Sequence, residues 1–245
     1  MKLTAMVVVT LIAAPALAAP TLSDRQRYDL CLSQARSQPE LAIDTANGWR
    51  IEGGGVPARH CLALAQLQRG DTAAAIKSFE GAALASEVAK DGQAPALWAQ
   101  AGNAALLGEQ YDVAVTYLST AIAEAAGSAK AEPLIDRARA YVELGKTAEA
   151  TADLDRATSI APANSTGWLL QATLARRLAN LPKAEAAILE AARLAPGDAD
   201  VQFEAGNIAA AQGKAELARA AWQAAVEAAP DAEAGIAAAK ALAAK

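Results

Sequence analysis

The sequence predicts an all-α protein built from a repeated helical unit, and three observations support this. Alanine is by far the commonest of the 245 residues and is the best helix former. β-Branched residues are sparse after the N-terminus, and only 4% of the residues are aromatic although 53% are hydrophobic. In addition, a pattern of small residues recurs at intervals of 34 to 39 positions along most of the chain.

The N-terminal segment reads as an export signal rather than as part of the fold. Lys2 precedes an apolar run over residues 3–14, and an "ALA" cleavage pattern ends at Ala18. We therefore expect a signal peptide over residues 1–18, cleavage after Ala18 and a mature protein in the bacterial periplasm. The alternative is an uncleaved membrane anchor, but the run is shorter than the ~20 residues that a membrane span needs.

The repeat is clearest in the second half of each copy, where an alanine is followed by a large residue and a second alanine. The copies are Ala75, Phe79 and Ala82; Ala114, Leu118 and Ala121; Ala150, Leu154 and Ala157; Ala184, Ile188 and Ala191; and Ala218, Trp222 and Ala225. Each copy also has a small residue twelve positions before its first alanine, namely Ala63, Gly102, Ala138, Ala172 and Gly206. The last three copies end in Pro162, Pro196 and Pro230, which stop a helix.

This pattern resembles the tetratricopeptide repeat (TPR), a 34-residue helix–turn–helix unit with a W…G…Y…A-x3-F…P signature. The resemblance covers residues 56–230 as five units, at about 56–94, 95–130, 131–164, 165–198 and 199–230. A degenerate unit over residues 19–55 precedes them, and a capping helix over residues 231–245 follows. The resemblance implies a right-handed α-solenoid of stacked antiparallel helix pairs that ends in this capping helix.

The composition suits such stacking. Small residues let helix axes approach near the low end of the 8–10 Å range, and one large residue per helix fills the remaining space. We expect turns at residues 69–71, 108–110, 145–146, 180–182 and 213–214, where a glycine can end a helix because it accepts positive φ. The segments 85–95 and 123–133 lengthen two joins, and we expect each to extend a second helix and then form a loop.

The only two cysteines are Cys31 and Cys61. An even number of cysteines in an exported protein suggests a disulfide. Both fall on first helices of adjacent units, three positions apart once the repeat offset is removed, so they can approach across the seam. We therefore expect a bond that ties the degenerate first unit to the array. The alternative is two buried thiols that pack as small hydrophobic groups.

We find no catalytic constellation and expect no enzyme activity, cofactor, metal or small-molecule substrate. The single histidine, His60, points about 100° away from its neighbour Cys61 on a helix, so we expect a partly exposed structural histidine rather than a dyad. The glycine-rich loop at residues 52–55 is not followed by the GxxxxGK[ST] pattern of a phosphate site. A formal charge of −5 disfavours nucleic acid and anionic lipid as partners.

The TPR resemblance implies a concave wall that is lined by the first helices and holds peptides or partner helices. Helical spacing places these residues on it: Gln100, Asn103, Leu106, Asp136, Arg139, Glu143, Thr173, Arg176, Phe203, Glu204 and Asn207. The charges around Arg139 and Arg176 suit a partner that is recognised by paired charges. The alternative is that all of these are ordinary solvent-facing residues. Chaperone-tail-binding members use an asparagine where Asn103 and Asn207 stand, but their accompanying lysine is absent, which puts a carboxylate clamp in doubt.

These features predict a non-catalytic interaction scaffold of the periplasm that binds a segment or helix of another cell-envelope protein in its groove. One alternative is a self-assembling structural component, which would form homo-oligomers through the thin polar face of the C-terminal helix or through the N-terminal unit. Another is an accessory subunit of an envelope complex, which the sequence does not distinguish from the first hypothesis.

Overall fold

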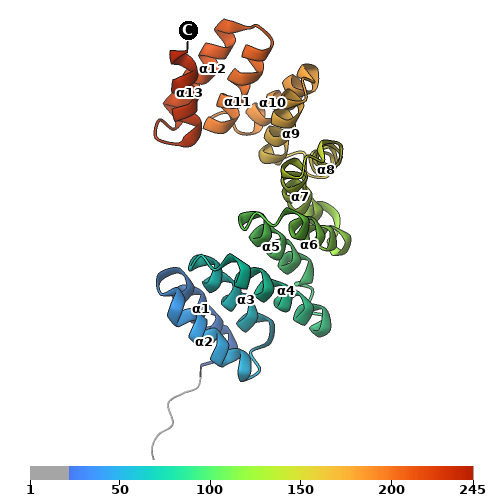
Figure 1. Cartoon of the computed structure of the whole chain (residues 1–245), viewed down its shortest axis with the longest axis vertical. Coiled ribbons are helices and arrows are strands. Elements are labelled where there is room, and N and C mark those ends of the chain that lie inside the picture. The colour runs from blue at the N-terminus through green and yellow to red at the C-terminus, as the bar shows by residue number, and fades with distance from the viewer. Residues whose placement is uncertain (1–21, 245) are drawn as a thin grey trace, which may run out of the picture.

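The structure is a computed structural model that describes residues 22–244, so the predicted signal peptide lies outside the described residues. Residues 22–244 form thirteen α-helices and one short 3-10 helix, and they contain no strand. Twelve helices form six consecutive pairs: α1 (Asp24–Ser37) with α2 (Pro39–Ile51), α3 (Gly55–Gln68) with α4 (Thr72–Ala89), α5 (Ala94–Leu107) with α6 (Tyr111–Glu124), α7 (Ala131–Glu143) with α8 (Thr147–Ile160), α9 (Ser165–Arg177) with α10 (Leu181–Leu194), and α11 (Ala199–Ala211) with α12 (Ala215–Ala228). The last helix, α13 (Glu233–Ala243), stands alone (Figure 1).

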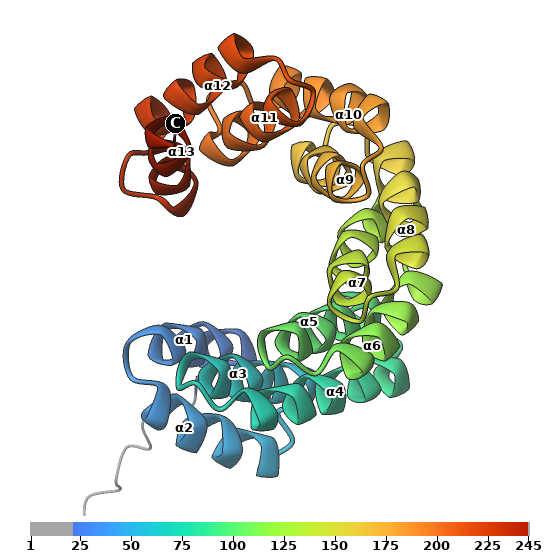
Figure 2. The same ribbon diagram turned by 45° about the horizontal axis from the view of Figure 1, so that its top comes forward.

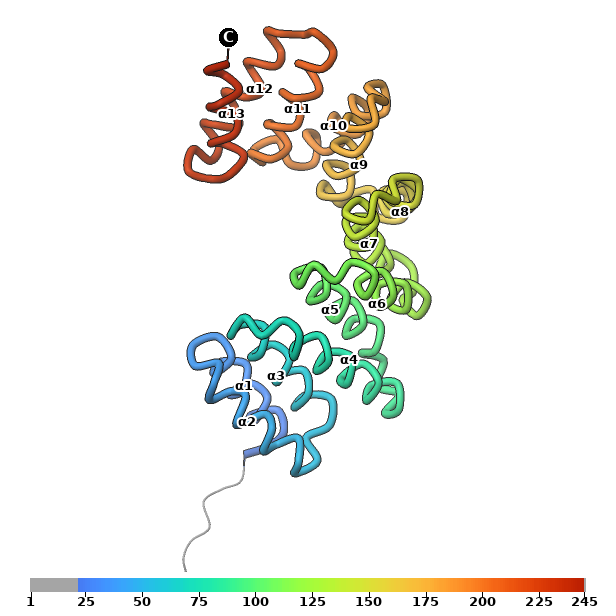
Figure 3. The backbone as a smooth tube through the Cα atoms, in the orientation of Figure 1, coloured from blue at the N-terminus to red at the C-terminus, as the bar shows by residue number. Residues whose placement is uncertain are grey.

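The pairs stack one after another, as the tube in Figure 3 traces, and the stack bends into an open arc. The first helix of each pair lies in an inner row and the second helix in an outer row (Figure 2). Apart from α1, which packs about equally against α2 and α3, each helix packs mainly against the helices directly before and after it in sequence. This arrangement confirms the prediction of an all-α solenoid, in which a unit buries its apolar face only against its neighbours.

Glycine and alanine at the recurring positions allow close approach between paired helices. A Cβ atom placed on Gly102 would lie 2.5 Å from Cγ of Leu118, and one on Gly206 would lie 2.3 Å from Cδ1 of Trp222. These distances are far below ordinary carbon contact distances of ~3.5–4.0 Å. In both pairs, therefore, the large residue of the second helix lies directly against the backbone of the first helix.

The turns inside the pairs share one backbone conformation. In five pairs, the residue two positions before the second helix has a positive φ: Gly70 (85°), Glu109 (55°), Gly145 (70°), Ala179 (59°) and Gly213 (76°). Glycine takes this conformation without a steric penalty, whereas other residues pay ~1–2 kcal/mol. The expectation of a glycine in this conformation is therefore wrong at residues 108–110, where Glu109 adopts it. The turn predicted at residues 180–182 lies slightly earlier, because α10 already begins at Leu181 and Ala179 has the positive φ.

The two longer joins differ from each other. Helix α4 runs for 18 residues to Ala89, which agrees with the expected extension. Helix α6 is not extended, because Ala125 is already in the β region, with φ −66° and ψ 156°, and Gly127 has a φ of 53°. The 3-10 helix η1 (Gly127–Lys130) then leads directly into α7, so the expectation for segment 123–133 is wrong.

Helix α13 packs against α12 and α11 at the C-terminal end of the stack. It buries Ala234, Gly235 and Ala238, and a Cβ on Gly235 would lie 2.0 Å from the carbonyl oxygen of Ala229. The opposite face leaves Ile236 45% exposed. Helix α13 thus takes the place of a further first helix and covers the last pair.

Candidate functional site

All of the residues predicted for the groove lie on first helices, which line the inner side of the arc in Figure 2. Helices α5, α7, α9 and α11 each contribute two or three of them, so residues that are distant in sequence share one wall. Their exposure differs: Asn103, Arg139 and Glu143 are exposed, whereas Asp136 and Glu204 are buried. Gln100, Leu106, Thr173, Arg176, Phe203 and Asn207 are intermediate.

Three of these residues form a polar cluster between α5 and α7. Nη1 of Arg139 donates to a carboxylate oxygen of Asp136 at 2.6 Å, and Asn103 of α5 lines the same hollow as this pair. Burial raises the pKa of Asp136, and the positive charge of Arg139 opposes this shift. The Arg139 side chain nevertheless remains 47% exposed, so one of its faces is open to solvent.

A second cluster joins α9 to α11. The guanidinium of Arg176 binds Glu204 through two contacts, Nε to Oε1 at 2.6 Å and Nη2 to Oε2 at 3.0 Å. Nδ2 of Asn207 donates to Glu204 at 3.4 Å, and Nε1 of Trp222 donates to Oδ1 of Asn207 at 3.1 Å. A fork-shaped pair of this kind is directional and strong. Arg176 therefore braces two neighbouring units, and its charge is already compensated within the chain.

Two hollows lie side by side along the inner row. The hollow between α5 and α7 has a volume of about 530 Å³, and its lining includes Leu106, Leu107 and Tyr111. The hollow between α7 and α9 is smaller, at about 160 Å³, and its lining is mostly apolar. Arg139 and Glu143, one turn apart on α7, line both hollows and form the ridge between them. The wall thus offers two adjacent apolar depressions separated by charged side chains.

The sequence reading missed several residues of these hollows, including Leu107, Tyr111, Leu170 and Arg177. Leu107 and Arg177 directly follow the predicted residues Leu106 and Arg176, and a wider helical face would have included them. Tyr111 opens a second helix, and the sequence reading assigned only first helices to the wall.

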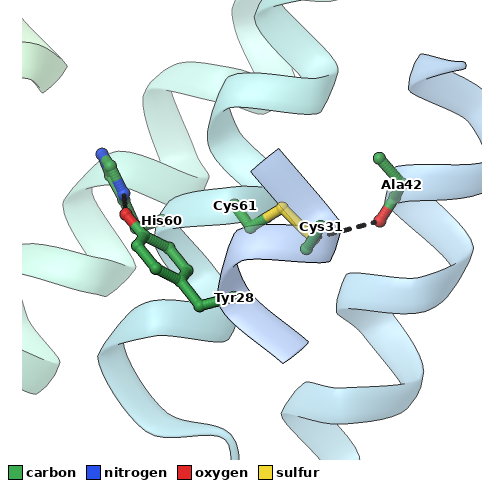
Figure 4. The surroundings of a disulfide bond; sticks show 5 residues. All are labelled: Tyr28, Cys31, Ala42, His60 and Cys61. Carbon is green, nitrogen blue, oxygen red and sulfur yellow. Dashed lines mark hydrogen bonds between the residues drawn. A yellow bond between two sulfur atoms is a disulfide. The ribbon is translucent and has the colours of Figure 1, made fainter. Parts of the chain in front are cut away.

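The N-terminal pair is tied to the array by a disulfide between Cys31 on α1 and Cys61 on α3, with Cα atoms 6.2 Å apart (Figure 4). Both cysteines are fully buried. Beside them, Nδ1 of His60 lies 2.5 Å from the hydroxyl of Tyr28, and Nε2 lies 2.7 Å from Oε1 of Gln100. Burial lowers the pKa of His60, which favours the neutral ring that accepts from Tyr28 and donates to Gln100. His60 is therefore a partly buried link between α1, α3 and α5.

The side chains of residues 22–244 include no group of three or more His, Cys, Asp or Glu residues that is arranged to hold a metal ion. Within the same range, no helix combines the length and apolar character that a membrane crossing requires.

Stacked helix pairs with a bare inner wall define an α-solenoid repeat protein. A family model described as "Tetratricopeptide repeat" matches residues 131–164, which span α7 and α8. The pair α7–α8 is therefore a tetratricopeptide repeat, and the chain as a whole has the fold of a TPR solenoid.

Solved structures with the same fold share little sequence with this chain. Pseudomonas aeruginosa pilF is 13% identical with a TM-score of 0.66, and the match covers 86% of this chain and 96% of that one. YrrB, a TPR protein with an unusual peptide-binding site, is 18% identical with a TM-score of 0.56, over 79% and 96% of the two chains. MamA from Desulfovibrio magneticus RS-1 is 16% identical with a TM-score of 0.60, over 73% and 97%. No curated protein matches the sequence.

Proposed function

We propose that this chain is a non-catalytic scaffold, exported to the bacterial periplasm, that holds a segment of another cell-envelope protein on its inner wall. The leader-like sequence over residues 1–18 supports export. The disulfide supports an oxidising compartment, because such bonds persist in the periplasm and are rare in the cytosol. The peptide-binding site of YrrB, which has a similar fold, supports a peptide as the kind of partner.

The observation that carries this proposal is the pair of adjoining hollows between α5, α7 and α9. Concave sites that bind ligands are mostly apolar and carry a few placed polar groups. Both hollows have this character, with Leu106, Leu107 and Leu170 inside and Arg139 and Glu143 on the shared ridge.

Site-specific photo-crosslinking in intact cells tests the proposal. A crosslinking amino acid placed at Leu107 or Thr173 on the inner row is expected to capture one and the same envelope protein. Matched positions on the outer row, Leu189 and Leu217, which are 63% and 61% exposed, are expected not to capture it. Capture of that protein from the outer row alone would contradict binding on the inner wall. N-terminal sequencing of this protein in the same sample tests export, because the mature chain is expected to begin at Ala19.

Self-assembly is the second candidate, and one observation favours it. No further helix pair covers α13 among the described residues, and this helix leaves Ile236 exposed. If copies associate through this end, Ile236→Glu should convert an oligomer into a monomer in light scattering, whereas Leu189→Glu on the outer row should not. A wild-type protein that is monomeric at high concentration rules this candidate out.

A further inference from the structure

The hollow between α7 and α9 is lined mainly by first helices. Nine of its ten lining residues belong to α7 or α9, and the tenth is Leu154 of α8 in the outer row. We therefore take its mouth to open on the inner wall. The volume of about 160 Å³ is close to that of an engineered ~150 Å³ apolar cavity that binds benzene. The space therefore suits one aromatic or large aliphatic side chain.

Opposite charges stand on opposite sides of this mouth. Arg177 extends from α9 and Glu143 from α7, and both are exposed. Neither takes part in the ion pairs found among residues 22–244. The third charged residue of the lining, Arg139, is already paired with Asp136. The mouth thus presents an uncompensated cation on one side and an uncompensated anion on the other.

Building on the proposed function, we propose that this hollow anchors an extended partner segment with an acidic–x–apolar–x–basic pattern. The apolar side chain fills the hollow, the acidic residue pairs with Arg177, and the basic residue pairs with Glu143. In an extended chain, residues i, i+2 and i+4 point to one face and span roughly 13 Å at ~3.3 Å per residue. The acidic and basic residues then flank the apolar one, just as Arg177 on α9 and Glu143 on α7 flank the hollow.

The proposal takes the partner segment to be extended rather than helical. Strands pack about 4.8 Å apart, whereas a helix with its side chains is ~10–12 Å across. The narrower chain needs less room between the side chains of Arg139, Glu143 and Arg177 that line the hollow. A helical spacing of the recognised residues is therefore an outcome that contradicts the proposal.

Selection from a phage library of randomised nine-residue peptides on the purified mature protein provides the test. The enriched peptides are expected to share one large apolar residue with an acidic residue two positions to one side and a basic residue two positions to the other. Enrichment of no peptide, of peptides without this charge pattern, or of peptides with charges at helical spacing would overturn the proposal.

Two substitutions then locate the bound peptide, each with a matched control. Thr173→Phe fills the hollow, and Thr116→Phe on α6 is its control. Each of these two hydroxyls donates a hydrogen bond of 3.0 Å to the carbonyl oxygen four residues earlier, but Thr116 is exposed and lies outside the hollow. Arg177→Glu removes the cation, and Arg156→Glu makes the same charge change on the exposed surface of α8. Fluorescence anisotropy measures the affinity for the enriched peptide. Thr173→Phe should lower this affinity by about tenfold or more, because it prevents burial of a large apolar side chain. Arg177→Glu should lower the affinity several-fold, and both controls should bind the peptide as the wild type does.

Circular dichroism confirms that each variant is folded, and Arg177→Glu tests the site even if Thr173→Phe is unstable. Equal affinity for Arg177→Glu and the wild type would remove the charge pairing from the proposal. If crosslinking captures a partner on the inner wall while the selected peptides ignore both substitutions, the scaffold function stands and this anchor site is wrong. If the peptides behave as expected but crosslinking maps the natural partner to the outer row, the proposed function is wrong instead.

Discussion

Gly206→Ala is expected to destabilise the protein, although alanine is the better helix former. Gly206 lies inside α11, and a methyl group there would stand 2.3 Å from Cδ1 and 2.4 Å from Nε1 of Trp222. The indole cannot simply swing aside, because its Nε1 donates to Oδ1 of Asn207 at 3.1 Å. Either the two helices separate or Trp222 gives up this hydrogen bond.

The expected magnitude follows from opposing contributions. Overpacking of a well-packed interface costs typically ~1–3 kcal/mol, and loss of a hydrogen bond adds roughly 1 kcal/mol. Replacement of glycine by alanine in a helix interior returns about 1 kcal/mol. We therefore expect a net loss of about 1–3 kcal/mol. Gly48→Ala in α2 is the matched control, because nothing lies within 4 Å of the added methyl group, and it should stabilise by up to about 1 kcal/mol.

Urea unfolding followed by circular dichroism measures both variants, and hydrogen exchange over residues 199–228 shows where stability is lost. Solenoid stability is a sum over neighbouring units, so Gly206→Ala should accelerate exchange mainly in α11, α12 and α13. The opposite signs of the two glycine variants are the decisive result. If Gly206→Ala stabilises the protein as Gly48→Ala does, the close approach of α11 and α12 is not what the small residue provides.

Three further predictions concern other parts of the stack. Joint replacement of Cys31 and Cys61 by serine should cost about 3–4 kcal/mol for a sequence separation of 30 residues and should speed hydrogen exchange in α1 and α2; unchanged exchange there would mean that the bond adds nothing. Ala179→Gly relieves a φ of 59° and should stabilise by about 0.5–1 kcal/mol, seen as a higher urea midpoint, whereas a lower midpoint would show that the turn is not strained. Burial lowers the pKa of His60, so the unfolded chain binds its proton more tightly and stability should decline as the pH falls below about 6.5, the ordinary pKa of histidine. Urea midpoints at pH 5.5 and 7.5 should differ less in His60→Gln than in the wild type, and an equal difference in both proteins would exclude this histidine as the source.

The fold class was predictable because the same packing problem is solved many times along the chain. One glycine or alanine signals little, but Gly102 and Gly206 stand at the same place in their units, each opposite a large residue of the second helix. The error at α6 has a local cause. Segments 85–95 and 123–133 look alike in composition, and only the backbone shows that Ala125 leaves the helix.

The left-handed turn residues show a limit of a different kind. Local preference favours glycine at positive φ, and Gly108 was available in its turn, yet it has a φ of −89° while Glu109 takes the positive value. The position of the residue with positive φ is set by the register of the second helix, which the packing of the whole pair determines. Residue types alone do not contain that register, and for this reason the positive φ of Ala179 was not predicted either.

The inner wall could be predicted at the level of helix faces but not of pairings. Helical spacing assigns Arg176 and Glu204 to the same wall, yet it contains no information about whether a side chain on α9 reaches one on α11. The structure shows that it does. Because Glu204 is buried, this ion pair links α9 to α11 and leaves neither charge free to bind a partner. Reversal of Arg176 would leave a buried carboxylate without its partner, a loss of about 3–5 kcal/mol, so weaker partner binding by that variant would not distinguish recognition from unfolding. Arg177 is one position further along the same helix, exposed and outside this brace, and for that reason it is the residue at which charge recognition can be tested without disturbing the stack.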